Sequence, residues 1–218
     1  PLVQSILGDD FEISVLVPQG ASPETFEPTA KQLSEVESAR FVFGTGLLEF
    51  EQALLHRVAR NEQIINLSHG IDLIAGTCSH AHHSHSHNHA HGVDPHIWTS
   101  PHELKTIARN AYDAIMTQYP DSSKYSEAYN RLARKIEQLD EECRQQCATS
   151  SAQAFIIYHP ALTYYARAYG IEQIAVETDG KEPSAKHIAK IIEQVKTNGV
   201  KCLLYQKEYP RSVVEVLA

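Results

Sequence analysis

The feature that most restricts the fold of this chain is a long amphipathic stretch from Asp121 to about Cys147. Apolar side chains recur in it every three or four residues, which is the spacing of one face of an α-helix. These positions are Tyr125, Ala128, Tyr129, Leu132, Ile136, Leu139 and Cys143. At 1.5 Å per residue such a helix is roughly 40 Å long, which exceeds the width of a small lobe. We therefore expect a rigid spine helix that joins two lobes.

Strand and helix patterns alternate on both sides of this stretch. Strands are expected at residues 11–17, 40–43, 63–67, 153–158, 173–177 and 201–205. Helices are expected at 29–39, 47–60, 104–115, 161–169, 184–196 and 211–218. Such alternation is typical of parallel sheets, so the sequence predicts the α/β class with two α/β lobes.

The expected domains are an N-terminal α/β lobe at 1–120, the linking spine helix at 121–148 and a C-terminal α/β lobe at 149–218. Only three strand patterns fall in the C-terminal lobe, and the last helix pattern carries no capping signal. We therefore expect this lobe to be incomplete and sequence to be missing at both ends of the chain.

Composition narrows the range of partners. The chain has 218 residues and a formal net charge of −8 at pH 7, which disfavours nucleic acid and mildly attracts cations. No stretch approaches the roughly 20 apolar residues that span a bilayer. The four cysteines include no CxxC pair, and Cys143 and Cys147, four apart on an expected helix, are expected to be packing residues and not a disulfide or a metal clamp. They leave the cellular compartment open.

A tract rich in histidine lies within the expected N-terminal lobe. Seven of the 13 histidines fall in this tract: His80, His82, His83, His85, His87, His89 and His91. Because small and polar residues separate them, segment 79–91 has little to bury, and we expect a mobile, solvated loop. Neutral imidazole binds zinc, copper and nickel. The tract is therefore predicted to supply accessory metal sites of low affinity.

Three single residues indicate a second kind of site. His96 lies beside a proline and two large apolar residues, His159 ends an apolar run, and Glu24 follows the first expected strand. Ligands of α/β proteins bind at the carboxyl ends of strands, and metal ligands far apart in sequence are typical of a site that tertiary structure assembles. Taken alone, His159 could equally be a strand-end histidine that is hydrogen-bonded locally, and His96 a partly buried histidine packed near Trp98. Glu24 alone could be an ordinary surface carboxylate. Taken together, the three predict a tight metal site.

Four motifs carry a resemblance to a known family: VLVPQGASPETFEPT, DPHIWTSP, AFIIYHPALTYYARAYGI and DGKEPSAKHIAKII. The chain resembles the metal-binding proteins of bacterial zinc and manganese ABC importers, the cluster A-I solute-binding proteins, and among them the zinc-uptake type with a His-rich loop. The resemblance covers nearly the whole chain. It implies two α/β lobes joined by one long rigid helix, with the metal in a cleft between the lobes.

The same resemblance implies the ligands. His96 and His159 match two metal ligands of the family, while Glu24 stands where the family usually has histidine. A carboxylate oxygen still binds zinc, so the substitution is compatible with a site. The fourth position of the family, an acidic residue or water, would belong to a segment beyond Ala218.

The resemblance also implies a function. We expect an extracytoplasmic zinc-binding protein, in the periplasm or at the cell surface, that captures Zn²⁺ and delivers it to an ABC transporter permease. It would be a monomer and not an enzyme, and any lipid anchor of a lipoprotein would lie outside this sequence. Mn²⁺ is less expected as cargo because the predicted ligands are rich in nitrogen.

Two alternatives share these residues. Two histidines and a glutamate also bind catalytic zinc with an open water position, as in a zinc-dependent hydrolase, although the sequence has no HExxH motif. A metal buffer without a transporter partner would use the same site for storage.

Overall fold

The computed structural model of the chain describes residues 1–55, 64–76, 92–177, 183–198, 200 and 202–206. Two compact units make up the chain, unit 1 with Pro1–Asp72 and Pro101–Asp140, and unit 2 with Leu73–Ser100 and Glu141–Ala218. Each unit combines helices with parallel strands, which confirms the predicted α/β class. Within the described ranges, no helix has both the length and the apolar character to cross a membrane.

The units are discontinuous in sequence, because Leu73–Ser100 belongs with the C-terminal part of the chain. This arrangement differs from the sequential division at 1–120, 121–148 and 149–218, which stays a prediction. A consequence for the site is that His96 and His159 both belong to unit 2.

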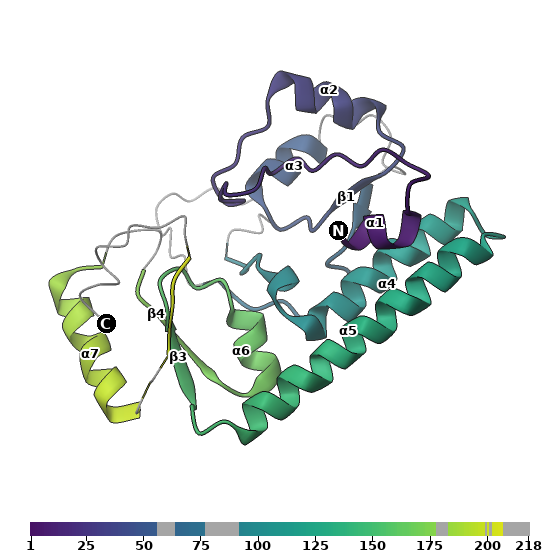
Figure 1. Ribbon diagram of the computed structural model, residues 1–218. Coiled ribbons are helices and arrows are strands. Elements are labelled where there is room, and N and C mark those ends of the chain that lie inside the picture. Colours follow the sequence, from purple (N-terminus) through teal and green to yellow (C-terminus); the bar gives the residue numbers. More distant parts are fainter. Residues whose placement is uncertain (56–63, 77–91, 178–182, 199, 201, 207–218) are drawn as a thin grey trace. The chain divides into compact units, whose positions relative to one another are not determined.

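In unit 1 the described residues form two parallel strands and several helices (Figure 1). Its elements are α1 (Leu2–Leu7), α2 (Ala30–Ser38), β1 (Val42–Gly44), α3 (Glu49–Leu55), β2 (Ile64–Asn66), α4 (Pro101–Gln118) and the first part of α5 (Ser123–Thr149). Strands β1 and β2 pair in parallel, with Val42 opposite Ile64, as the alternating pattern predicted. The core forms where Ile6 and Leu7 of α1 pack with Ala111 and Ile115 of α4.

The long amphipathic stretch forms one continuous helix of 27 residues, α5. The predicted helix is confirmed, displaced by two residues toward the C-terminus. Tyr125, Ala128 and Ile136 of the expected stripe are buried, whereas Leu139 is 45% exposed. Residues of α5 up to Asp140 belong to unit 1 and the remainder to unit 2, so the helix contributes to both.

The strand expected at residues 11–17 is wrong. The structure assigns no strand there. Phe11 and Ile13 instead place their side chains in the core formed by α1 and α4, and Leu16 packs against Val36 and Leu54. The alternation of apolar and polar residues therefore indicates which side chains are buried. It does not show that another backbone segment lies alongside to form the hydrogen bonds of a strand. Helix α1 was not among the expected elements.

The part of unit 2 that the structure describes is built on a three-stranded parallel sheet in the order β4-β3-β5. Its elements are the 3-10 helix η2 (Ile97–Thr99), the end of α5, β3 (Ala154–Ile157), α6 (Thr163–Tyr169), β4 (Glu172–Ala175), α7 (Ala185–Asn198) and β5 (Leu203–Leu204). All residues of the central strand β3 are buried. The expected helix at 211–218 and residues 56–60 of the expected helix at 47–60 lie outside the described residues.

The two faces of this sheet are covered by different helices (Figure 1). Ile156 of β3 packs in one cluster with Ile191 of α7, and Phe155 and Ile157 pack in another with Ala166 of α6. This follows from the period of two along a strand, which sends neighbouring side chains to opposite faces. Because the strands are parallel, the residues that follow β3, β4 and β5 meet at one edge: His159, Glu177 and Gln206.

Candidate metal centre

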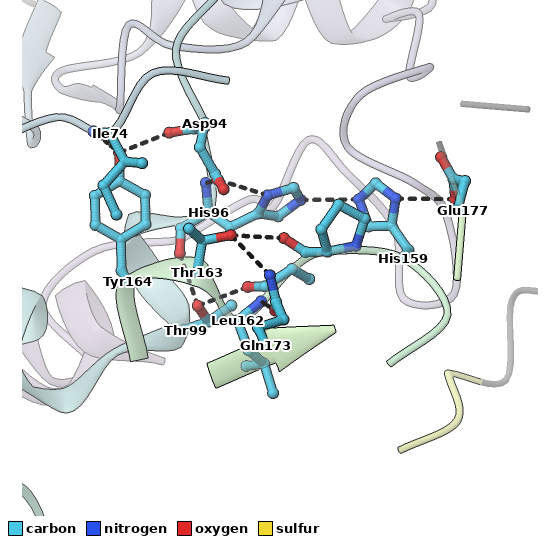
Figure 2. A network of polar contacts seen from close by, with 12 residues as sticks. Ile74, Asp94, His96, Thr99, His159, Leu162, Thr163, Tyr164, Gln173 and Glu177 are labelled. Carbon is cyan, nitrogen blue, oxygen red and sulfur yellow. Dashed lines mark hydrogen bonds and ion pairs between the residues drawn. The ribbon is translucent and has the colours of Figure 1, made fainter. Parts of the chain in front are cut away.

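His96 is held by the short segment that precedes η2. The Oδ1 atom of Asp94 accepts a hydrogen bond from the backbone N–H of His96 at 2.9 Å and lies 2.9 Å from Nδ1 of the His96 ring. Asp94 is anchored in turn by Tyr164, a fully buried residue of α6 whose hydroxyl donates to the Asp94 carbonyl oxygen at 2.8 Å (Figure 2). The Tyr164 hydroxyl also accepts the N–H of Ile74 at 3.1 Å. The His96 ring is therefore fixed in direction and only 5% of the residue is exposed.

His159 is held at the carboxyl edge of the sheet of unit 2. It follows β3 and is 8% exposed. Its Nδ1 atom lies 3.1 Å from Oε2 of Glu177, which follows the neighbouring strand β4. The backbone N–H of Glu177 donates to the carbonyl oxygen of Tyr158 at 2.9 Å, so pairing of the two strands continues up to the site.

The two rings meet through their Nε2 atoms, which lie 3.3 Å apart (Figure 2). A carboxylate can only accept a hydrogen bond, so each neutral imidazole carries its proton on Nδ1 and directs the Nε2 lone pair at the other ring. Two lone pairs that face each other at this distance repel unless a cation lies between them. The site thus consists of two carboxylate–histidine pairs, Asp94 with His96 and Glu177 with His159. The Nε2 atoms of the two rings converge on one point.

The separation of the Nε2 atoms fits a tetrahedral metal ion. Zinc–imidazole bonds are about 2.0–2.1 Å long, and two such bonds at a tetrahedral angle place their nitrogen atoms about 3.3–3.4 Å apart. The structure gives 3.3 Å for His96 and His159. Ligating histidines commonly donate their other ring N–H to a carboxylate, which orients the ring and raises its basicity. Both the distance and the ring partners therefore suit zinc.

The charge of Asp94 is maintained despite its burial. Burial raises the pKa of its carboxyl group, but hydrogen bonds from the ring and the backbone N–H of His96 and from the Thr163 hydroxyl lower it by more. The net pKa lies below its ordinary value of 3.8, so Asp94 is a carboxylate at neutral pH. The negative charge beside Nδ1 strengthens Nε2 as a ligand for a cation.

His96 and His159, two of the three residues predicted for the tight site, lie next to each other in unit 2. Glu24 belongs to unit 1, where it is exposed on the loop that precedes α2. Its role as a ligand stays a prediction. The seven histidines of the tract, from His80 to His91, lie outside the described residues.

Sequence reasoning did not identify the residues that support the two histidines. Asp94 stands two residues before His96, a spacing at which an aspartate can accept the backbone N–H of the later residue, so the local sequence carried a signal. Glu177 follows β4, the strand next to β3, which precedes His159, and this adjacency depends on the strand order. The hydrogen bonds of Tyr164 and Gln206 reach over 70 and 47 positions in sequence and left no local signal.

These features define the class of protein: an α/β protein with a buried pair of imidazoles, each oriented by a carboxylate, for a transition metal ion. A family model described as "Zinc-uptake complex component A periplasmic" (ZnuA) matches residues 1–218. The chain therefore belongs to this family.

Individual relatives agree with this membership. The high-affinity zinc uptake system protein ZnuA of Bacillus subtilis is 30% identical over 225 residues, which cover 99% of this chain and 70% of the relative. Zinc-binding protein AdcA of Streptococcus pyogenes is 28% identical over 235 residues, and this chain spans 45% of its length. A crystal structure of ZnuA superposes with a TM-score of 0.83 at 28% identity, covering all of this chain and 82% of that one.

Proposed function

We propose that this chain captures Zn²⁺ outside the cytoplasm and delivers it to the membrane permease of an ABC importer. The observation that supports this most directly is the 3.3 Å approach of the Nε2 atoms of His96 and His159, each ring held by a carboxylate. The names of the relatives, which include a zinc uptake system protein and a zinc-binding protein, point to the same cargo.

His96 and His159 are the two nitrogen ligands in this proposal, and Glu24 supplies a third ligand through a carboxylate oxygen. Two imidazoles and a carboxylate form a set that zinc accepts readily, whereas manganese prefers more oxygen ligands. We therefore propose zinc as the preferred ion over Mn²⁺.

The histidine tract has an accessory role in the proposal. His80, His82, His83, His85, His87, His89 and His91 would bind further ions weakly and raise the metal concentration near the tight site. The ion is cargo, so we expect no hydrolysis of ester or peptide substrates by the zinc-loaded protein. Measurable turnover would instead favour the hydrolase alternative.

The ligand assignment is tested by replacing each histidine. His96→Ala and His159→Ala should each abolish tight zinc binding, measured by competition with a chromophoric chelator. His69→Ala is the matched control, because His69 is an exposed histidine of unit 1. Sub-micromolar zinc affinity in either of the first two variants would refute the site.

The role of Glu24 is tested with a neighbour on the same loop. Glu24→Gln keeps the shape of the side chain but removes the charge, and we expect it to weaken zinc binding at least about tenfold. Glu27→Gln is the control, since Glu27 is also exposed on this loop. Equal affinities of the two variants would remove Glu24 from the ligand set.

Stoichiometry separates the tight site from the tract. Deletion of residues 79–91 should leave one tight zinc equivalent in a calorimetric titration, and Mn²⁺ should not displace it. Loss of the tight equivalent in the deletion variant would mean that the tract supplies a ligand. Delivery itself is tested by zinc uptake in cells that carry the cognate permease, with His159→Ala as the variant expected to fail.

A further inference from the structure

Gln206 makes a two-point contact with the backbone of His159. Its Nε2 atom donates to the His159 carbonyl oxygen at 2.9 Å, and its Oε1 atom accepts the His159 N–H at 3.1 Å. A glutamine amide presents the same donor and acceptor as a peptide group. The side chain of Gln206 therefore binds the main chain of His159 as a neighbouring strand would.

The position of this contact explains its geometry. Strands β3 and β5 pair in parallel, with Ile156 opposite Leu203 and Ile157 opposite Leu204. Continued in register, this pairing places His159 opposite Gln206. Residue 160 is proline, which has no N–H and cannot extend a ladder. The Gln206 amide thus secures the backbone at the last position before the chain leaves the sheet.

We propose that Gln206 is a positioning residue for the metal centre, a role that rests on the function proposed above. Glu177 orients the ring of His159. The position of the ring also depends on the position of the His159 backbone, which Gln206 holds through hydrogen bonds. A small shift of that backbone would move Nε2 away from the 3.3 Å separation that suits a tetrahedral ion. Gln206 does not contact the metal and acts only through His159.

The test compares three full-length variants with the wild-type protein. Gln206→Leu removes both hydrogen bonds, and Gln206→Glu keeps the acceptor for the His159 N–H but loses the donor to its carbonyl oxygen. Gln153→Leu is the matched control, because Gln153 is exposed and directly precedes the opposite end of β3. Zinc affinity is measured by chelator competition, and Co²⁺ absorption reports the coordination geometry.

We expect Gln206→Leu to weaken zinc binding roughly ten- to hundredfold, the range typical of residues that orient metal ligands. The Co²⁺ spectrum of this variant should also change. Gln206→Glu should show a smaller loss, and Gln153→Leu should match the wild type. A general loss of stability would lower the melting temperature without altering the Co²⁺ spectrum of the folded protein.

Two results would overturn the proposal. Zinc affinity within twofold of the wild type together with an unchanged Co²⁺ spectrum in Gln206→Leu would do so, and where that variant does not fold, the same readings from Gln206→Glu decide. Absence of zinc binding by the wild-type protein would overturn the proposed function as well. If the wild-type protein binds zinc and the Gln206 variant shows the same affinity and Co²⁺ spectrum, only the positioning role is overturned.

Discussion

The substitution Asp94→Asn isolates the contribution of one carboxylate charge to metal binding. Asparagine keeps an oxygen that can accept from the backbone N–H and the ring Nδ1–H of His96, which both lie 2.9 Å from Oδ1. The shape of the turn is therefore retained, and the charge beside the ring is lost. A bound cation draws electron density from the imidazole and makes Nδ1–H a stronger donor, so the charge matters most in the metal-bound state.

The size of the effect follows from the type of hydrogen bond. A hydrogen bond to a charged group contributes about 1.5–3 kcal/mol, and a neutral one about 0.5–1.5 kcal/mol. The difference is about 1–1.5 kcal/mol, and 1.4 kcal/mol corresponds to a tenfold change in affinity. We therefore expect Asp94→Asn to bind zinc about tenfold more weakly. Asp94→Ala removes the acceptor as well and should approach a loss of about a hundredfold.

The assay is chelator competition at fixed pH and ionic strength, with melting temperatures to verify folding. Asp113→Asn is the control, because Asp113 is an exposed aspartate paired with Arg109 in unit 1 and should leave zinc affinity unchanged. If Asp94→Asn binds zinc within twofold of the wild type, the charge of Asp94 does not act through His96 and the reasoning fails.

Three further predictions concern stability. Ile115→Ala should lower the free energy of unfolding by about 2–5 kcal/mol, because Ile115 is fully buried in the core of unit 1; a loss below about 1 kcal/mol in chemical denaturation would contradict this packing. Hydrogen bonds from Lys124 and Tyr125 hold the pKa of Asp10 below its usual value of 3.8. Their stabilising effect should be complete above about pH 5 and lost as pH falls through the folded pKa. The difference in melting temperature between the wild type and Asp10→Asn should accordingly shrink from pH 5 to pH 2, and a constant difference would exclude this linkage. Zinc at a thousand times its Kd should stabilise the wild type by about 4 kcal/mol but leave His159→Ala unchanged, and equal shifts in thermal melts would place the binding elsewhere.

The sequence predicted those elements whose signal is local. The spacing of three or four residues between apolar side chains such as Tyr125, Ala128 and Ile136 identified α5, because the residues on the buried face of a helix are apolar. The period-two alternation of residues 11–17 is also a local signal, but it did not correspond to a strand. Ile13 and Leu16 are apolar because they enter the two cores of unit 1, and no periodicity shows whether another backbone pairs beside them.

In the candidate site, too, the residues with a local sequence signal could be predicted and those without one could not. His159 could be identified because it ends an apolar run at the end of a strand, where α/β proteins bind ligands, and His96 because it lies beside a proline and two large apolar residues. Their supporting residues could not be assigned, because Glu177 and Gln206 reach His159 only through the strand order β4-β3-β5. When a side chain hydrogen-bonds to a residue on another strand, the sequence around that side chain does not indicate which residue is its partner.

The charges of the site give a reason for the choice of a divalent ion. Asp94 and Glu177 are both nearly buried, with side chains 11% and 9% exposed, and burial of two carboxylates is costly unless positive charge is close. The two imidazoles that separate them are ligands for a cation in their neutral form, and one divalent ion between the rings balances the two carboxylates.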